Sequence, residues 1–169
     1  MEQTIQFKKH LVWKRILFIV LLMLAFYIIF QFSAQNGELS GSLSEKITMK
    51  VVEILSKIKD MNDTMKLYYV QRLHPVIRKL AHFSIYMVVG FSTMGLMCTF
   101  SMKNLMKVVA SLGIGVLYAI TDEIHQAFVP GRGPSAIDVG IDSLGVLTGI
   151  FILIIMIVFT ESIVNWLKK

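Results

Sequence analysis

The sequence predicts an all-α protein: a bundle of four transmembrane helices with an extracellular amphipathic helical segment between the first and second spans. Three observations support this. Hydrophobic residues fill 55% of the 169 positions and charged residues only 17%, and the mean hydropathy is +0.67. Four apolar stretches each approach the ~20 residues that a helix needs to cross a bilayer. Lys and Arg are concentrated beside some of these stretches, and the length suits one domain, residues 1–169.

Composition also excludes some classes of protein. The single cysteine, Cys98, excludes an internal disulfide framework, and its apolar neighbours indicate a packed small side chain rather than a reactive thiol. The formal net charge is +6. On so apolar a chain this charge indicates membrane topology and contact with anionic lipid. We therefore expect membrane lipids, and not nucleic acid, among the partners.

The apolar stretches define the spans in order. The expected spans are residues 16–32, 80–100, 105–126 and 136–160. Trp13 before the first span and Trp166 after the last are typical of interfacial anchors. The first stretch follows basic residues, as a signal peptide would. It is longer than a usual signal core, however, and no small-x-small pair follows it, so we expect it to be retained as a span.

The basic residues indicate how the spans are oriented. The N-terminal arm, the loop at 101–107 and the C-terminal tail together hold only two acids, Glu2 and Glu161. The same three segments hold eight basic residues: Lys8, Lys9, Lys14, Arg15, Lys103, Lys107, Lys168 and Lys169. The rest of the chain has equal numbers of basic and acidic residues. The positive-inside rule then predicts a multi-pass protein of the plasma membrane with both termini in the cytoplasm, and with residues 33–79 and 122–137 outside.

The long outer segment contains a predicted helix of its own. Ser42-x-x-Glu45 has the pattern of a capping box. Apolar side chains then recur at helical spacing, at Ile47, Val51, Ile54, Leu55 and Ile58. This amphipathic helix is too polar to span; it lies on the outer leaflet, caps the bundle, or simply covers loop backbone. A second short helix is expected over residues 64–73, ending before Pro75.

The ionisable residues of three spans are expected at one depth. The apolar runs 83–100 and 143–160 each extend about 27 Å inward from a charged residue. The run 108–121 is about 21 Å long, so it needs one more turn to cross. The residues just outside these runs are therefore expected near the outer interface: His82, Asp122, Glu123, His125 and Asp142. Charged groups at that depth are costly and indicate a functional site.

On the second span, Arg78, His82 and Tyr86 are four residues apart and share one helix face. His82 is a candidate base or ligand-binding residue, and it also fits a structural histidine that only makes hydrogen bonds. Arg78 and Lys79 are candidates for binding an anionic group. They equally fit interfacial anchors of the helix.

On the third span, Asp122 shares a face with His125 and Gln126, and Tyr118 lies one turn deeper. Glu123 is expected to point elsewhere. His125, like His82, fits either a functional or a structural histidine. This face is therefore expected to contribute the second part of the site.

On the fourth span, Asp138, Asp142, Gly145 and Gly149 share a face. The Gly145-x-x-x-Gly149 pair permits close helix approach, so the acidic face is expected to point into the bundle. The same pair leaves open whether that approach occurs within one chain or in a homo-oligomer. Ser135-x-x-Asp138 also fits a simple helix cap, whereas Asp142 lies beyond one.

The loop before the fourth span contains a rigid turn, Pro130-Gly131-Arg132-Gly133-Pro134. Arg132 is its only charged residue. A guanidinium group in this position is suited to binding a phosphate or carboxylate through two hydrogen bonds.

Several of these motifs resemble the VanZ-like family of bacterial membrane proteins. The resemblance extends from about residue 16 to residue 155. Its motifs are Phe32-Ser33-Ala34-Gln35-Asn36-Gly37 with Ser40 and Ser44, Arg78-Lys79-Leu80-Ala81-His82-Phe83 with Tyr86, the string from Leu117 to Gln126, Phe128-Val129-Pro130-Gly131-Arg132, and residues 138–149. One departure is Asp142, where the family often has Asn. The resemblance implies a role at the Gram-positive cell envelope and in reduced sensitivity to teicoplanin-type glycopeptides.

The first functional hypothesis is a binding protein at the outer membrane rim. Its ligand would be an anionic envelope lipid, a lipid-linked cell-wall precursor or the glycopeptide antibiotic itself. The candidate ligand-binding residues are Arg78, Lys79, His82, Tyr86, Tyr118, Asp122, Glu123, His125, Gln126, Arg132, Asp138 and Asp142.

The alternative hypothesis is an intramembrane phosphatase-like or transferase-like enzyme acting on lipid-linked phosphate. Its candidate catalytic residues are His82, Asp122, His125 and Asp142. No His-Glu-x-x-His spacing is present, and we expect neither a metal nor a cofactor. A transporter is disfavoured because no ionisable residues line the deeper part of the spans.

Overall fold

The computed structural model describes the backbone of residues 2–34 and 37–168, and the side chains of residues 6, 9–34 and 44–168. Gln35 and Asn36 of the sequence motif lie outside the described residues. Ser42 of the predicted capping box lies outside the described side chains.

The described part of the chain forms five helices joined by short loops. They are α1 (Glu2–Ser33), α2 (Gly37–Lys59), α3 (Asp63–Met97), α4 (Asn104–Ala127) and α5 (Ala136–Leu167). All except α2 are long and apolar enough to cross a membrane. The expected all-α fold is therefore confirmed, and the chain is a multi-pass membrane protein.

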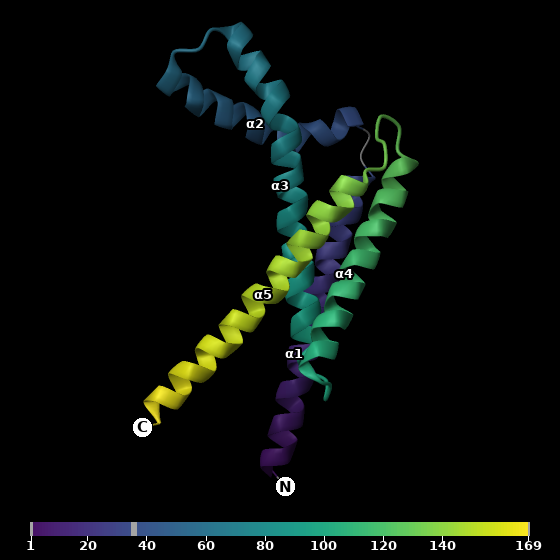
Figure 1. Cartoon of the computed structure of the whole chain (residues 1–169), viewed down its shortest axis with the longest axis vertical. Coiled ribbons are helices and arrows are strands. Elements are labelled where there is room, and N and C mark those ends of the chain that lie inside the picture. The colour runs from purple at the N-terminus through teal and green to yellow at the C-terminus, as the bar shows by residue number, and fades with distance from the viewer. Residues whose placement is uncertain (1, 35–36, 169) are drawn as a thin grey trace.

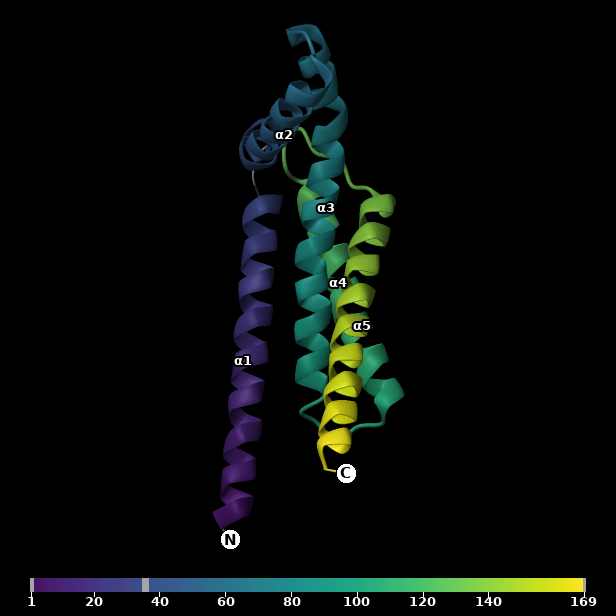
Figure 2. The ribbon, with the colours of Figure 1, turned by 90° about the vertical axis from the view of Figure 1, so that its left-hand side faces the viewer.

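Helix α3 is the central element of the bundle. It packs against α1, α2, α4 and α5. The N-terminus and the C-terminus lie at one end of the molecule, whereas α2 and the loop between α4 and α5 lie at the other (Figure 1, Figure 2). This second end of the bundle, where the polar helix ends gather, is called the rim below.

Helices α3 and α5 cross in direct backbone contact. A Cβ atom added at Gly149 would lie 1.9 Å from the carbonyl oxygen of Met87, and one at Gly90 would lie 1.9 Å from that of Val146. A Cβ at Gly145 would meet backbone almost as closely. Only glycine fits at such contacts. The predicted glycine pair therefore packs against α3 of the same chain, which directs the acidic end of α5 toward α3.

The expected helix end before Pro75 is wrong. Helix α3 continues through Pro75 as a single helix from Asp63 to Met97. A proline costs the helix one hydrogen bond, here to the carbonyl of Gln71, but neighbouring contacts can compensate. One such contact joins α3 to α2, where His74 Nε2 and Ser44 Oγ lie 3.0 Å apart.

Helix α2 lies across the bundle axis at the rim (Figure 1). It packs on α3 through Thr48 and Val52, which are fully buried. Most of the predicted apolar face is exposed instead: Ile47, Val51, Ile54 and Ile58. An exposed row of this kind is typical of a helix lying on a membrane surface.

Candidate functional site

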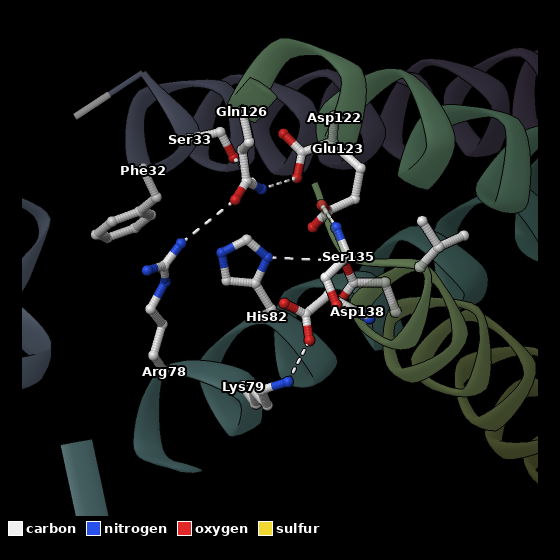
Figure 3. A network of polar contacts seen from close by, with 12 residues as sticks. Phe32, Ser33, Arg78, Lys79, His82, Asp122, Glu123, Gln126, Ser135 and Asp138 are labelled. Carbon is white, nitrogen blue, oxygen red and sulfur yellow. Dashed lines mark hydrogen bonds and ion pairs between the residues drawn. The ribbon is translucent and has the colours of Figure 1, made fainter. Parts of the chain in front are cut away.

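Polar side chains from three helices converge at the rim. Figure 3 shows Arg78 and His82 of α3 facing Gln126 and Asp122 of α4, whereas Lys79 points to Asp138 of α5. The first turns of α5 complete the arrangement. The three helices therefore meet at one depth, as the lengths of the apolar runs predict.

At the centre lies a group that we call the carboxylate cluster: His82, Asp122 and Asp142. One nitrogen or oxygen of each lies within 4.8 Å of the others. His82 Nδ1 is 3.7 Å from Asp142 Oδ2. The side chain of Asp142 is only 1% exposed, and neither of its oxygens has a hydrogen-bond partner among the described residues. Two carboxylates are therefore held close together away from water.

Gln126 connects the cluster to two other helices. Its Nε2 donates to Asp122 Oδ2 at 3.0 Å and lies 3.3 Å from Ser33 Oγ of α1. Its Oε1 accepts a hydrogen bond from Arg78 Nη2 at 3.3 Å. The side-chain amide of Gln126 therefore orients the Asp122 carboxylate and holds one nitrogen, Nη2, of the Arg78 guanidinium.

Glu123 corrects a prediction made from the helix pattern. It was expected to point away from the site, but its side chain is buried and lines the same small cavity as His82 and Asp142. Its Oε2 accepts a hydrogen bond from the backbone N–H of Ser135 at 2.8 Å. A carboxylate there complements the positive end of the α5 helix dipole. Its role is thus to join α4 to the start of α5.

Ser135 and Asp138 form the predicted helix cap. Ser135 Oγ accepts from the backbone N–H of Asp138 at 3.3 Å. The carboxylate of Asp138 is also ion-paired with Lys79 of α3 (Figure 3). Lys79 and Asp138 therefore neutralise each other, so each is less available to a ligand than an unpaired charge would be.

Arg132 binds the C-terminal end of α1. Its Nη1 donates to the Ser33 carbonyl at 3.2 Å and its Nη2 to the Phe32 carbonyl at 2.9 Å. A cation stabilises these helix-terminal carbonyls. Its Nε is buried and has no partner among the described residues. Desolvation, followed by the charge of Arg78, lowers the pKa of Arg132 to about 10, so it remains charged at neutral pH.

Two predicted site residues lie outside the cluster and pack against α1. The ring of Tyr118 stacks on Phe26 at a centroid distance of 3.7 Å, and its hydroxyl donates to the Phe26 carbonyl at 2.9 Å. The His125 ring stacks on Phe30 at 5.0 Å. Both side chains therefore make contacts between helices. Neither of them is one of the three residues of the cluster.

Tyr86 lies beneath the cluster, one turn deeper than His82. It is fully buried, and its ring centroid is 6.5 Å from that of His82. Its hydroxyl has no hydrogen-bond partner within normal distance among the described residues. Asp122 and Asp142 are among the charged groups that act on it electrostatically. A buried hydroxyl without a normal hydrogen bond therefore lies within electrostatic range of both carboxylates of the cluster.

Two cavities adjoin these residues. The larger, which we call the arginine cavity, has a volume of about 110 Å³. It is lined by Ile28, Ile29, Phe32, Ser44, Ile47, Ile77, Arg78, Ala81, His82, Ile85 and Arg132. The smaller measures about 20 Å³ and is lined by Arg78, Lys79, His82, Glu123, Gln126, Asp138, Ile141 and Asp142. Arg78 and His82 are common to both cavities.

A model of a known protein family matches this chain. The family is described as VanZ/LLP1, and the match covers residues 18–158. The chain belongs to the VanZ/LLP1 family. No curated protein and no solved structure matches it. The matched range includes every residue of the candidate site described in this section.

Sequence reasoning missed one side of the site in this VanZ/LLP1 chain. The cavity wall formed by Ile28, Ile29 and Phe32 of α1 was not among the candidates, nor was Ser33. The apolar wall carries no distinctive signal, because it is part of an ordinary span. Ser33 did belong to the family motif at 32–37, which was the only available indication.

The arrangement also bears on acid–base chemistry. An imidazole beside a carboxylate is the usual pairing of a base with the group that orients it. The 3.7 Å between His82 and Asp142 is longer than a hydrogen bond.

Proposed function

We propose that this VanZ/LLP1 protein binds an anionic amphiphile of the cell envelope at the outer rim of the plasma membrane. The head group would contact Arg78 and Arg132, and the apolar tail would lie along α1 and α3. The observation that supports this most directly is the arginine cavity, where two guanidinium groups meet walls that are otherwise mostly apolar.

The two arginines retain hydrogen-bonding capacity toward a ligand. A guanidinium carries five N–H donors. Within the described part of the chain, Arg78 makes one hydrogen bond, to Gln126, and the buried Nε of Arg132 has no partner. Two like charges also repel each other in a poorly hydrated place. A phosphate or carboxylate between them would relieve that repulsion and accept charge-assisted hydrogen bonds.

The walls of the cavity suit the other half of an amphiphile. Ile28, Ile29 and Phe32 of α1 face Ile77 and Ile85 of α3 across it. An acyl or prenyl chain entering from the bilayer would meet a similar apolar surface here. The ligand class therefore includes anionic lipids, lipid-linked wall precursors and acyl-bearing glycopeptides.

The topology that we propose directs the arginine cavity toward the cell wall. The N-terminal arm, the loop between α3 and α4 and the C-terminal tail hold most of the unbalanced positive charge, which is typical of a cytoplasmic side. The rim is at the opposite end of the molecule (Figure 2). A protein that occupies or removes an acylated glycopeptide at this surface would lower susceptibility to teicoplanin-type antibiotics.

The test compares Arg78→Ala with Arg72→Ala, which removes an exposed arginine from the same helix outside the cavity. Protein in lipid nanodiscs is titrated with a fluorescent phosphatidylglycerol, a polyprenyl phosphate or acylated teicoplanin, with a zwitterionic lipid as reference. We expect Arg78→Ala to weaken binding of the anionic ligands about 10- to 100-fold, because a charge-assisted hydrogen bond contributes about 1.5–3 kcal/mol.

Arg72→Ala should bind like the wild type. The three anionic ligands distinguish a lipid from an antibiotic as the natural ligand. Only ligands of the class that binds in the arginine cavity should lose affinity in Arg78→Ala. Equal binding of all ligands by the wild type and Arg78→Ala would exclude the arginine cavity as their site.

A further inference from the structure

Among the described residues, no Lys or Arg makes direct contact with the two acids of the carboxylate cluster. Lys79 is paired with Asp138, and no Lys or Arg nitrogen of the described residues lies within 4.0 Å of Asp122 or Asp142. Only His82 approaches Asp142, and it is charged only when protonated. Two buried carboxylates without a cation are strongly unfavourable. The cluster therefore requires either protons or a bound cation.

The geometry suits a cation. His82 Nδ1 or Nε2 and one oxygen each from Asp122 and Asp142 lie within 4.8 Å of one another. They come from three different helices, α3, α4 and α5, and the glycine contacts of α3 with α5 fix the spacing of the two helices that carry His82 and Asp142. An imidazole nitrogen with two carboxylate oxygens is a common set of three protein ligands, with further positions left for water.

A second observation supports a bound cation and concerns Tyr86, which is not one of the acids. The hydroxyl of Tyr86 is fully buried beneath the cluster, close enough to Asp122 to interact with it, but it makes no hydrogen bond of normal geometry with any described residue. Buried hydroxyls nearly always have partners. A cation with a bound water or hydroxide would provide an acceptor for this O–H. The unsatisfied oxygens of Asp142 would be satisfied by the same ion.

We propose that His82, Asp122 and Asp142 bind one divalent transition-metal ion, Zn²⁺ or Mn²⁺. The imidazole ligand favours Zn²⁺, and Mn²⁺ suits the two carboxylates while accepting a nitrogen ligand, whereas Mg²⁺ and Ca²⁺ prefer oxygen-only sets. The ion's two positive charges match the two carboxylates. Gln126, which donates to Asp122 at 3.0 Å, holds that ligand in orientation as supporting residues do at metal sites.

The ion would lie beside the arginine cavity, because His82 lines both cavities. A metal-binding site and an anion-binding site would then share one side chain. The metal site does not depend on the proposed ligand, however, since none of its three ligands is an arginine.

The experiment measures metal binding directly. Full-length protein in nanodiscs is stripped with a chelator and titrated with Zn²⁺ or Mn²⁺ alone, and bound metal is measured by equilibrium dialysis with elemental mass spectrometry. We expect one ion per chain in the wild type. Asp142→Asn and His82→Gln should each lower the affinity by roughly 100-fold or more, since even loss of a supporting residue costs 10- to 100-fold.

Glu161→Gln is the matched control, because it makes the same acid-to-amide change at an exposed position of α5. It should bind metal like the wild type. The thermal midpoint of unfolding gives a second readout: metal should raise it in the wild type and in Glu161→Gln but not in Asp142→Asn. Binding should also weaken on acidification, because the ligands must lose their protons.

Two results would overturn the metal site. One is wild-type protein that retains no more Zn²⁺ or Mn²⁺ than Asp142→Asn. The other is one ion per chain in every variant, which would place it elsewhere. If Asp142→Asn does not fold, His82→Gln alone decides between these outcomes. A proton shared by the two carboxylates would then be the remaining way to balance the cluster.

Discussion

At the scale of single residues, the rim contains two tyrosines in contrasting environments. Tyr118 uses its hydroxyl to hold α1 against α4, whereas the hydroxyl of Tyr86 is buried without a partner among the described residues. Both residues were predicted as ligand-binding candidates from helix spacing alone. Spacing shows which face a side chain occupies, but it does not show whether a backbone carbonyl from another helix meets it.

The same change at the two tyrosines should therefore have opposite effects. Tyr118→Phe should lower the free energy of unfolding by about 1 kcal/mol, because it removes a hydrogen bond. Tyr86→Phe in metal-free protein should leave it unchanged or raise it, because it removes an unsatisfied buried hydroxyl. Thermal or denaturant unfolding in one detergent provides the comparison. Equal destabilisation by both changes would mean that the Tyr86 hydroxyl has a partner.

The Glu123 prediction failed for a related reason. Helix geometry separates the directions of Asp122 and Glu123 correctly, but the following loop folds back and supplies the N–H of Ser135. Loop conformation is not encoded in helical periodicity. By contrast, the convergence of His82, Asp122 and Asp142 followed from counting apolar residues, because the bilayer sets one common depth for charges.

At the scale of elements, the crossing of α3 and α5 positions the acidic end of α5. The Gly145-x-x-x-Gly149 pattern predicted close approach, and the structure identifies the partner as α3 of the same chain. The glycine at position 90, on the facing helix, was not among the predicted contacts. A lone glycine in an apolar helix is too common to indicate a crossing.

Gly149→Ala tests the crossing. The added methyl would overlap the backbone of Met87, which cannot move away as a side chain could. We expect a loss of stability of about 1–3 kcal/mol, typical of overpacking, measured by thermal unfolding. Gly140→Ala is the matched change on the same helix, where an added Cβ meets no other atom. It should be neutral or slightly stabilising, because alanine favours helix, and similar losses in both variants would contradict the close contact.

At the scale of the whole molecule, the four spans and their order were predictable because each is long and apolar. The path of the segment between the first and second spans was not predictable. Pro75 indicated a break, yet the chain continues through it as one helix. The amphipathic pattern of α2 was evident from the sequence, and the structure shows that most of its apolar face remains exposed rather than covered by α3.

The proposed orientation can be tested by thiol labelling. Cys98 is the only cysteine of the sequence, so Cys98→Ala removes background labelling. In that background, Gly133→Cys at the rim should react with a membrane-impermeant maleimide in intact cells. Ser101→Cys, in the exposed loop at the other end, should react only after permeabilisation. The reverse pattern would invert the topology.

The uninterrupted course of α3 gives the protein a projecting arm. From Asp63 to Lys79 the helix rises about 25 Å beyond the level of the cluster, at ~1.5 Å per residue. Together with the tip that joins it to α2, this arm projects past the bundle at the rim (Figure 1). His82 lies on the same continuous helix, about two turns from Pro75. A contact that tilted the arm would therefore also shift the histidine of the carboxylate cluster.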